Sequence, residues 1–350
     1  MDETVEEFYK KYRAKNLPWM VHWELTYGCN LTCVHCYTGS EKSKKELSLS
    51  QIKDIAQQLK EMGTIYVILS GGEPFARQDI MEIIEVIRKD FFVIILTNAT
   101  LITSSQAKRL KELQVSSVEI SLYAIDENLH DSITGVKGSY TKTIEGINRL
   151  IEEGVRIRIK SSIIKQNLME YPKLFSFARQ LGVDFSASPT IIPRLNGVSD
   201  TYNNALSEEE LAVYSLQWIK HNSEIFEKDA IHTISEEREF NCNAGNTTCS
   251  ITPDGSVKPC PVLPVKLGNL LEKSYKELWV DKPQKNLKDL RVAGLNEYSK
   301  CKTCSWSSSC SPCPGANWLE NKNEYIAAKK YCSRVEGIGK AIIKQMKLKI

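Results

Sequence analysis

The 350-residue sequence has no apolar run long enough to span a bilayer and no large excess of one charge. Its 46 Lys and Arg against 43 Asp and Glu leave a net charge of +3, so no strong field for nucleic acid is expected. Residues 1–7 are acidic and lack an apolar run, which argues against a secretion signal or transit peptide. These absences predict a cytoplasmic protein that binds neither membrane nor nucleic acid. Because the cytoplasm is reducing, its cysteines are expected to bind metal rather than form disulfides.

Cysteine is missing from the middle of the chain. Of the 11 cysteines, three lie at 29–36, none lies between Cys36 and Cys242, and the rest lie at 242–332. This uneven placement predicts two modules. An odd total fits paired disulfides poorly and fits sets of metal ligands better.

The first three cysteines, Cys29, Cys33 and Cys36, have the spacing C-x3-C-x2-C. A closed tetrahedral metal site needs four ligands, so three thiolates leave one corner open. The open corner indicates a four-iron cluster whose unique iron holds a small molecule. A zinc site or three scattered buried cysteines are the alternatives, and His35 sits too close between two of the cysteines to be an obvious fourth ligand.

Strand-like and helix-like patterns alternate from His22 to about Pro189 and make six β/α units. The expected strands are His22–Tyr27, Thr64–Leu69, Phe91–Leu96, Val118–Leu122, Val155–Ile164 and Val183–Ala187. The expected helices are Leu49–Met62, Asp79–Lys89, Ser104–Leu113, Tyr140–Glu153 and Tyr171–Leu181. Six units predict an α/β fold with an open, partial (β/α)6 TIM-type barrel, although a flat doubly wound sheet has the same periodicity.

Polar residues stand where the expected strands end. Ser70-Gly71-Gly72-Glu73-Pro74 follows the second strand, Thr97 and Asn98 follow the third, Ser121 and Tyr123 end the fourth, and Lys160 lies in the fifth. Because the carboxyl ends of parallel strands meet at one mouth, these residues are expected to converge with the cysteine loop.

The remaining segments flank this core. Residues 1–20 are expected to be a helical extension, 21–190 the barrel, 191–240 a connection with a helix starting at Ser207 and a charged run at 235–239, and 241–350 a cysteine-rich domain. Thr252-Pro253-Asp254-Gly255 is a hairpin turn signal that would place Cys249 and Cys260 on or beside neighbouring strands.

The triple cysteine, followed one β/α unit later by Gly71-Gly72-Glu73-Pro74, resembles the signature of the radical SAM enzymes. The resemblance implies the same partial barrel, with S-adenosylmethionine (SAM) bound to the free iron of a four-iron cluster and cleaved by one electron to a 5′-deoxyadenosyl radical. It implies that Gly71–Pro74 contacts the SAM amino group and that the adenine packs against His35. Glu73 would be structural or would lie near the ribose. Further cofactor candidates are Thr97, Asn98, Ser121, Tyr123 and Lys160, of which Lys160 could instead point to solvent.

The C-terminal cysteines resemble the SPASM extension of radical SAM peptide and protein maturases. The resemblance implies two auxiliary four-iron clusters, the first held by Cys242, Cys249, Cys260 and Cys313 and the second by Cys301, Cys304, Cys310 and Cys332. The family has x3 where this chain has x2 between Cys310 and Cys313. If all eight cysteines are ligands, neither auxiliary cluster has an open iron and the role of both is electron transfer. A zinc module is the alternative.

The resemblance implies that the radical abstracts hydrogen from a peptide or protein substrate and that the auxiliary clusters take up an electron. A flavodoxin or ferredoxin-type reductant is expected. Because little chain precedes Cys29, a peptide substrate would need either a separate leader-binding protein or direct recognition by the barrel mouth. The alternatives are a small-molecule enzyme of the tetrapyrrole decarboxylase or alcohol dehydrogenase type, or a non-catalytic iron–sulfur or zinc protein. The sequence singles out no catalytic base.

Overall fold

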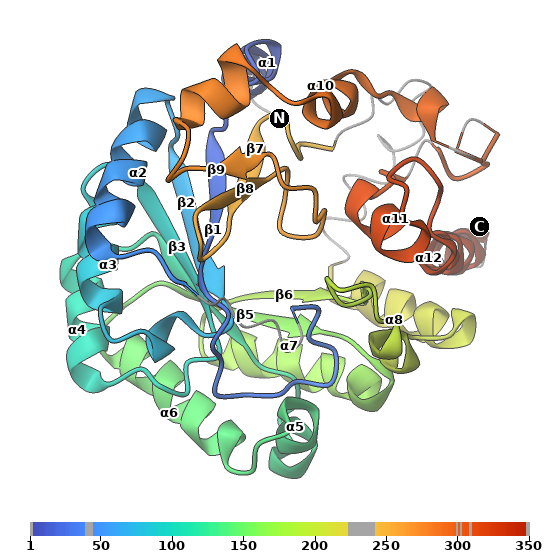
Figure 1. The fold of residues 1–350 in the computed structure, drawn as a ribbon. Helices are drawn as coiled ribbons and strands as arrows, with labels where there is room; N and C mark the ends of the chain where they lie inside the picture. Colours follow the sequence, from blue (N-terminus) through green and yellow to red (C-terminus); the bar gives the residue numbers. More distant parts are fainter. Residues whose placement is uncertain are drawn as a thin grey trace.

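The computed structural model describes residues 3–38, 45–222, 242–298, 300–301, 303–307 and 310–347. Within these ranges one nine-stranded sheet has the order β6-β5-β4-β3-β2-β1-β7-β8-β9. Its parallel strands are β1 (Met20–Thr26), β2 (Tyr66–Gly71), β3 (Phe92–Thr97), β4 (Ser117–Ser121), β5 (Ile157–Ser162) and β6 (Asp184–Ser188). These strands are neighbours in chain order, so the sheet winds in one direction (Figure 1). The partial barrel is confirmed, and the doubly wound sheet, whose strand order reverses, is excluded.

Helices cover the outer face of the curved sheet (Figure 1). They are α2 (Leu49–Glu61), α3 (Ile80–Arg88), α4 (Ser104–Glu112), α6 (Ser139–Glu152) and α7 (Tyr171–Gln180), and each lies within a residue or two of its expected position. Ser48 begins α2 with a capping box to Gln51, which satisfies two backbone donors at the helix start. The sequence pattern did not predict α5 (Glu127–Thr134), an eight-residue helix with few apolar positions that Asp126 caps.

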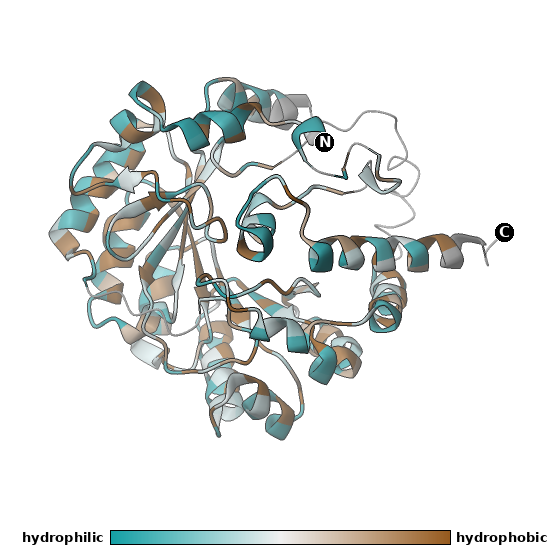
Figure 2. Cartoon of the chain, turned by 45° about the vertical axis from the view of Figure 1, so that its right-hand side comes forward, coloured by the Kyte–Doolittle hydropathy of each residue, from teal (hydrophilic) through white to brown (hydrophobic). Residues whose placement is uncertain are grey.

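The two faces of the barrel strands differ in polarity. Val21 and Trp23 of β1 are fully buried against the helices, together with residues such as Ile52 of α2. Side chains alternate along a strand, so His22 and Glu24 point to the barrel interior. Figure 2 shows the apolar residues gathered where strands meet helices and hydrophilic residues on the outer helix surfaces. The core therefore lies outside the barrel wall, and the interior is left to polar side chains.

The cysteine-rich segment continues the barrel sheet. Strand β7 (Thr248–Ile251) pairs in parallel with β1, with Cys249 opposite Val21, and is followed by the antiparallel strands β8 (Ser256–Lys258) and β9 (Gly268–Asn269). The turn at 252–255 joins β7 to β8, which confirms the expected hairpin. The β7–β8–β9 unit is thus hydrogen-bonded to the strand that leads into the first cysteine loop.

The other helices flank the barrel and the C-terminal segment. They are α1 (Glu3–Ala14), η1 (Pro74–Ala76), η2 (Lys165–Glu170), η3 (Asp200–Asn204), α8 (Glu208–His221), η4 (Glu277–Asp281), α10 (Lys285–Val292), η5 (Leu295–Glu297), α11 (Pro314–Asn321) and α12 (Lys329–Lys347). Ser207 caps α8, as expected. Helix α12 lies beside α8, and Lys340 bonds to Glu208 at 2.9 Å. None of the helices in the described ranges combines the length and apolar character that crossing a membrane requires. The charged run at 235–239 lies outside the described residues.

Candidate active site

The first three cysteines lie on one tight loop after β1. The backbone N–H of Cys36 donates to the carbonyl of Cys33 at 3.1 Å, and the N–H of Leu31 donates to Cys29 Sγ at 3.4 Å. Burial, together with the nearby Cys36 and Cys29 thiols, raises the pKa of Cys33 to about 12. Three thiolates that repel one another at this spacing are stabilised by a cationic iron centre, so the loop fits a cluster with three protein ligands.

Helix α5 holds this loop in place. Its last residues accept two backbone hydrogen bonds from the loop, Thr32 to Thr134 at 2.9 Å and Val34 to Ile133 at 3.0 Å. The final turn of a helix leaves such carbonyls without intrahelical donors, so they are free to bond another segment. The helix that the sequence analysis missed therefore positions the cysteine loop.

The glycines after β2 pack against the same loop. The N–H of Gly72 donates to Thr26 at 2.7 Å and that of Glu73 to Gly28 at 2.8 Å. A Cβ on Gly71 would lie 2.1 Å from the Thr26 carbonyl oxygen, and one on Gly72 would lie 2.2 Å from that of Gly28. Glycines after a strand often let a ligand approach the backbone closely. The structure shows another cause, which is the close approach of the chain itself.

Glu73 ties the end of β2 to the end of β3. Its fully buried carboxylate accepts hydrogen bonds from Thr97 Oγ1 at 2.7 Å, the Asn98 N–H at 2.7 Å and the Phe75 N–H at 3.0 Å. Burial raises the pKa of Glu73, and these three donors oppose that shift. The contacts give Glu73 a structural position, one of the two roles that the family resemblance offered.

Thr97 and Asn98 extend this network to the cysteine loop. The Asn98 amide donates to Asn30 Oδ1 at 3.0 Å and lies 3.9 Å from Cys29 Sγ. The Thr97 hydroxyl, besides donating to Glu73, accepts from the Ala99 N–H at 2.9 Å. Both side chains thus make their hydrogen bonds within the protein, and through them they support the cysteine loop.

His35, which belongs to the cysteine loop, packs against Tyr123. Their ring centroids are 4.7 Å apart at an interplanar angle of 74°, an edge-to-face contact. Burial lowers the pKa of His35 to about 4, so its imidazole is neutral at pH 7, and Nδ1 has no hydrogen-bond partner among the described residues. Burial and the charge of Cys33 raise the pKa of Tyr123, which Ser121 contacts through a side-chain hydrogen bond. His35, Ser121 and Tyr123 therefore come together beside the cysteines.

Lys160 faces the barrel interior, since its neighbour Ile159 is in the core. Its ammonium lies 2.9 Å from Glu119, which also pairs with Arg158 at 3.3 Å. The Lys160 side chain is 45% exposed, so it keeps access to solvent from the open side of the barrel.

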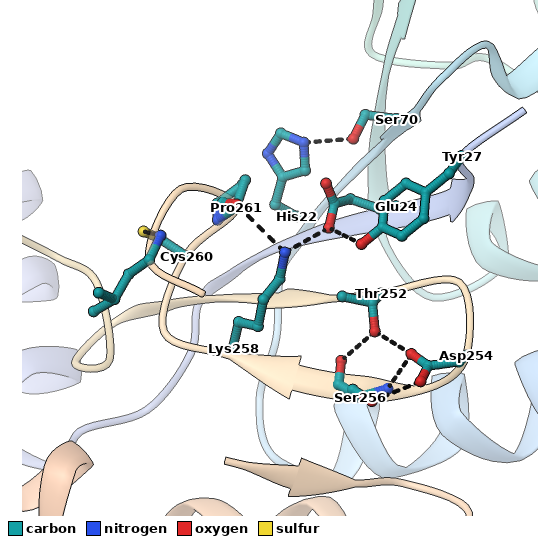
Figure 3. A network of polar contacts seen from close by, with 11 residues as sticks. His22, Glu24, Tyr27, Ser70, Thr252, Asp254, Ser256, Lys258, Cys260 and Pro261 are labelled. Carbon is teal, nitrogen blue, oxygen red and sulfur yellow. Dashed lines mark hydrogen bonds and ion pairs between the residues drawn. The ribbon is translucent and has the colours of Figure 1, made fainter. Parts of the chain in front are cut away.

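A second polar group inside the barrel was not predicted (Figure 3). Glu24 of β1 pairs with Lys258 of β8 at 3.0 Å, and their side chains are only 1% and 8% exposed. The Lys258 ammonium also donates to the Pro261 carbonyl at 3.3 Å, and Glu24 Oε1 has no partner among the described residues. His22 bonds to Ser70 beside this pair. The alternation of polar and apolar residues along β1 was the signal that could have found Glu24 and His22.

His22 is electrically neutral at physiological pH. Burial and the positive charges of Lys160 and Lys258 lower its pKa to about 4. A neutral imidazole both donates and accepts a hydrogen bond, which suits the shared bond with Ser70.

The C-terminal cysteines form two groups. Cys242 and Cys260 pack on one apolar cluster with Leu263 and Leu290. Burial, followed by the nearby thiols of Cys313 and Cys242, raises the pKa of Cys260 to about 12. The second group brings together the four cysteines expected for the second cluster, Cys301, Cys304, Cys310 and Cys332. Burial and then the neighbouring thiols of this group raise the pKa of Cys301, Cys310 and Cys332.

Cys249 lies apart from both groups. It is fully buried in the main core, and its Sγ is 3.0 Å from the hydroxyl of Tyr275. Among the described residues no three His, Cys, Asp or Glu side chains are grouped closely enough to hold a single metal ion.

Comparison with known proteins agrees with this geometry. Residues 23–174 match the model of the radical SAM superfamily, and residues 242–305 match that of the SPASM iron–sulfur cluster-binding domain. The subtilosin biosynthesis protein AlbA of Bacillus subtilis is 30% identical over 326 residues, which cover 91% of this chain and 71% of AlbA. The chain belongs to the radical SAM superfamily. These family matches imply that it binds SAM and iron–sulfur clusters.

Other relatives of this radical SAM protein differ in substrate. An AdoMet-dependent heme synthase of Methanosarcina barkeri is 27% identical over 345 residues, covering 91% of this chain and 97% of the synthase. The fold is shared with Streptococcus suis SuiB bound to its precursor peptide SuiA, with a TM-score of 0.72, 21% identity and coverage of 94% of this chain and 80% of SuiB. Membership in the superfamily therefore leaves the substrate class open.

Proposed function

We propose that this radical SAM enzyme abstracts hydrogen from a peptide or protein substrate. The observation that carries the proposal is the charged interior of the barrel, where Glu24 pairs with Lys258 and Glu119 pairs with Lys160. Charges of both signs on the inward faces of the barrel strands suit a substrate with amide and ionised groups.

Two relatives support a peptide substrate. AlbA is named for the biosynthesis of the bacteriocin subtilosin, and SuiB has been solved with a precursor peptide in the same fold. A separate leader-binding protein and a flavodoxin or ferredoxin-type reductant complete the proposed set of partners.

The residues of the loop and the barrel take distinct parts in this activity. Cys29, Cys33 and Cys36 hold the cluster that, when bound, supplies the electron for SAM cleavage. Asn98 and Glu73 fix the loop that carries these ligands, through the bonds at 3.0 and 2.7 Å. The C-terminal cysteines would hold auxiliary clusters, which would supply an acceptor for the electron that the substrate gives up.

The loop surroundings offer further contacts to SAM. The edge at Gly71–Pro74 would meet the amino group, and His35 would pack against the adenine, since its neutral ring has an unpaired nitrogen. Ser121, Tyr123 and Lys160 line the same mouth.

The second candidate is a decarboxylase acting on an iron porphyrin. The heme synthase of Methanosarcina barkeri favours it, because the match spans 97% of that enzyme. Lys160 and Arg158 could pair with the carboxylates of such a substrate.

One experiment separates the two candidates. The reconstituted enzyme is given SAM, dithionite and either precursor peptides encoded beside its gene or Fe-coproporphyrin III. The proposal expects a peptide to lose two hydrogens as 5′-deoxyadenosine forms, and the porphyrin to stay unchanged. Loss of carbon dioxide from the porphyrin, with no change in any peptide, would overturn it in favour of the second candidate.

A further inference from the structure

Residues 191–204, here called the crossing segment, pass over the cysteine loop after β6. Arg194 Nη1 donates to the carbonyl oxygen of Cys36 at 3.0 Å. The next backbone N–H, that of Leu195, donates to the carbonyl oxygen of Tyr37 at 2.8 Å. A segment that the sequence predicted only as a connection therefore bonds directly to the third cysteine of the loop.

The crossing segment is held in shape by its own hydrogen bonds. The backbone N–H of Arg194 donates to the Val198 carbonyl at 2.8 Å, and that of Gly197 donates to the Arg194 carbonyl at 2.7 Å. Gly197 has a φ of +87°, which a residue with a side chain rarely adopts. The Thr201 hydroxyl donates to the Ile192 carbonyl at 2.7 Å and closes the turn on the other side. This tight turn fixes the backbone from which the Arg194 side chain reaches the loop.

Further bonds anchor the far end of the crossing segment. The Tyr202 hydroxyl donates to Glu320 of α11 at 3.0 Å, and the Asn204 amide donates to the Val34 carbonyl in the cysteine loop at 3.2 Å. A side chain carried by a segment tied at both ends loses less freedom when it forms an ion pair than one on a loose surface loop. The position of Arg194 is therefore set by the fold.

Arg194 carries its charge in an ion pair with Asp200. Its Nε lies 2.7 Å from Asp200 Oδ1, and the two side chains are 23% and 49% exposed. The bond to Asp200 raises the pKa of Arg194, and the negative charge of Cys36 adds to this shift. The guanidinium thus interacts with the Cys36 thiolate as well as with its carbonyl. Because Asp200 is the more exposed partner, solvent screens its charge more strongly.

Charge near an iron–sulfur cluster shifts its reduction potential. Uptake of one electron from a reductant such as dithionite adds one negative charge to a cluster and moves no proton. A nearby cation therefore stabilises the reduced form, and a nearby anion destabilises it. Hydrogen bonds to the ligand sulfur act in the same direction as a cation, and the Thr38 hydroxyl lies 3.0 Å from Cys36 Sγ.

We propose that Arg194 is a positioning residue for the SAM-binding cluster and that its ion pair with Asp200 sets the reduction potential of that cluster. The guanidinium holds the Cys36 end of the loop and brings a positive charge to this ligand, and Asp200 offsets part of the charge. Arg194 therefore favours electron uptake, and Asp200 opposes it. The inference rests on the cluster that the superfamily implies, and it holds for either candidate substrate.

A redox titration of charge variants tests this proposal. The parent enzyme, R194Q, R194K and D200N are reconstituted with iron and sulfide, and EPR spectra are recorded as the solution potential is lowered. The SAM-binding cluster is identified by the signal that changes when SAM is added. We expect a more negative potential for this cluster in R194Q, a more positive one in D200N, and a value near that of the parent in R194K, which keeps the charge. R194Q and D200N break the same ion pair, so loss of structure cannot explain shifts of opposite sign.

Shifts in the same direction in R194Q and D200N, or an unchanged potential in both, would overturn the inference. D200N alters a half-exposed side chain and keeps the test open if R194Q does not fold, because a potential that is unchanged or more negative in D200N overturns the inference by itself. Iron release to a chelator, measured without SAM or turnover, tests the positioning role. R194Q should release iron faster than D200N, since only R194Q loses the bond to Cys36. Equal release rates would contradict that role.

Discussion

The Glu73 carboxylate accepts the backbone N–H of Asn98 at 2.7 Å, and the Asn98 side chain in turn lies 3.9 Å from Cys29 Sγ. This relationship joins the ends of two barrel strands to the first cluster ligand. The loop cysteines are thus supported by polar groups that are not themselves proposed as ligands, an arrangement that commonly tunes a metal site.

Replacing Asn98 by Ala should weaken the SAM-binding cluster. The variant loses the bond to Asn30 at 3.0 Å and the contact with Cys29, whereas its backbone N–H still bonds to Glu73. Loss of such an outer partner typically lowers metal affinity or activity by ~10- to 100-fold. Cluster loss to a chelator and 5′-deoxyadenosine formation measure the effect. The control is Gln57→Ala, which removes an exposed bond on α2; equal behaviour of the two variants would contradict the supporting role of Asn98.

Replacing Gly72 by Ala should displace the end of β2 from the cysteine loop. The new Cβ would lie 2.2 Å from the Gly28 carbonyl oxygen, so the backbone must move. Gly294→Ala is the matched control, because its nearest contact, Glu297 Oε2, is at 3.5 Å. We expect G72A to lose most SAM cleavage and G294A to keep it, as measured by chromatography of 5′-deoxyadenosine. A fully active G72A would show that the loop does not need this strand end.

The Glu24–Lys258 pair should show strong coupling in stability. Removing one partner leaves a buried, uncompensated charge and destabilises by about 3–5 kcal/mol, whereas replacing both with apolar residues is often near neutral. We therefore expect Glu24→Leu and Lys258→Met each to lower the free energy of unfolding strongly, and the double variant to recover most of the loss. Urea unfolding measures all three against the parent. Additive losses would mean that the two side chains are not coupled.

Acid should destabilise the protein through its buried histidines. His22, His35 and His130 have pKa values lowered to about 4 by burial, against 6.5 for the ordinary side chain. The unfolded chain then binds more protons than the folded one, so this stabilisation is complete above pH 6.5 and is lost as pH falls toward 4. A shift of this size corresponds to at most about 3 kcal/mol for one histidine. The free energy of unfolding between pH 7 and 5 should fall less steeply in His22→Gln, and an unchanged slope would contradict the assignment for His22.

The sequence predicted the barrel because its signals are local. Apolar runs such as residues 64–69, capping residues such as Ser48, and the turn at 252–255 act within a few positions. The structure has a strand at 66–71, the cap at Ser48 and the hairpin after β7. It did not predict α5, which has only a few apolar residues and gains its place by bonding to the cysteine loop.

Contacts between residues far apart in the chain could not be predicted from the sequence, for a different reason. The face of β7 on which Cys249 lies follows from the pairing of this strand with β1, more than 200 residues earlier in the chain. The Glu24–Lys258 pair likewise joins strands 234 positions apart. Spacing along a chain does not encode which residues of distant strands become partners.

The most direct test of the account is transfer of deuterium from substrate to SAM-derived product. The reconstituted enzyme and its Cys33→Ala variant are incubated with SAM, dithionite and a precursor peptide deuterated at its side chains. The account predicts deuterated 5′-deoxyadenosine from the parent enzyme and none from Cys33→Ala, which keeps its auxiliary iron. A fully loaded parent enzyme that cleaves no SAM, or that gives only unlabelled 5′-deoxyadenosine although the peptide is modified, would contradict it.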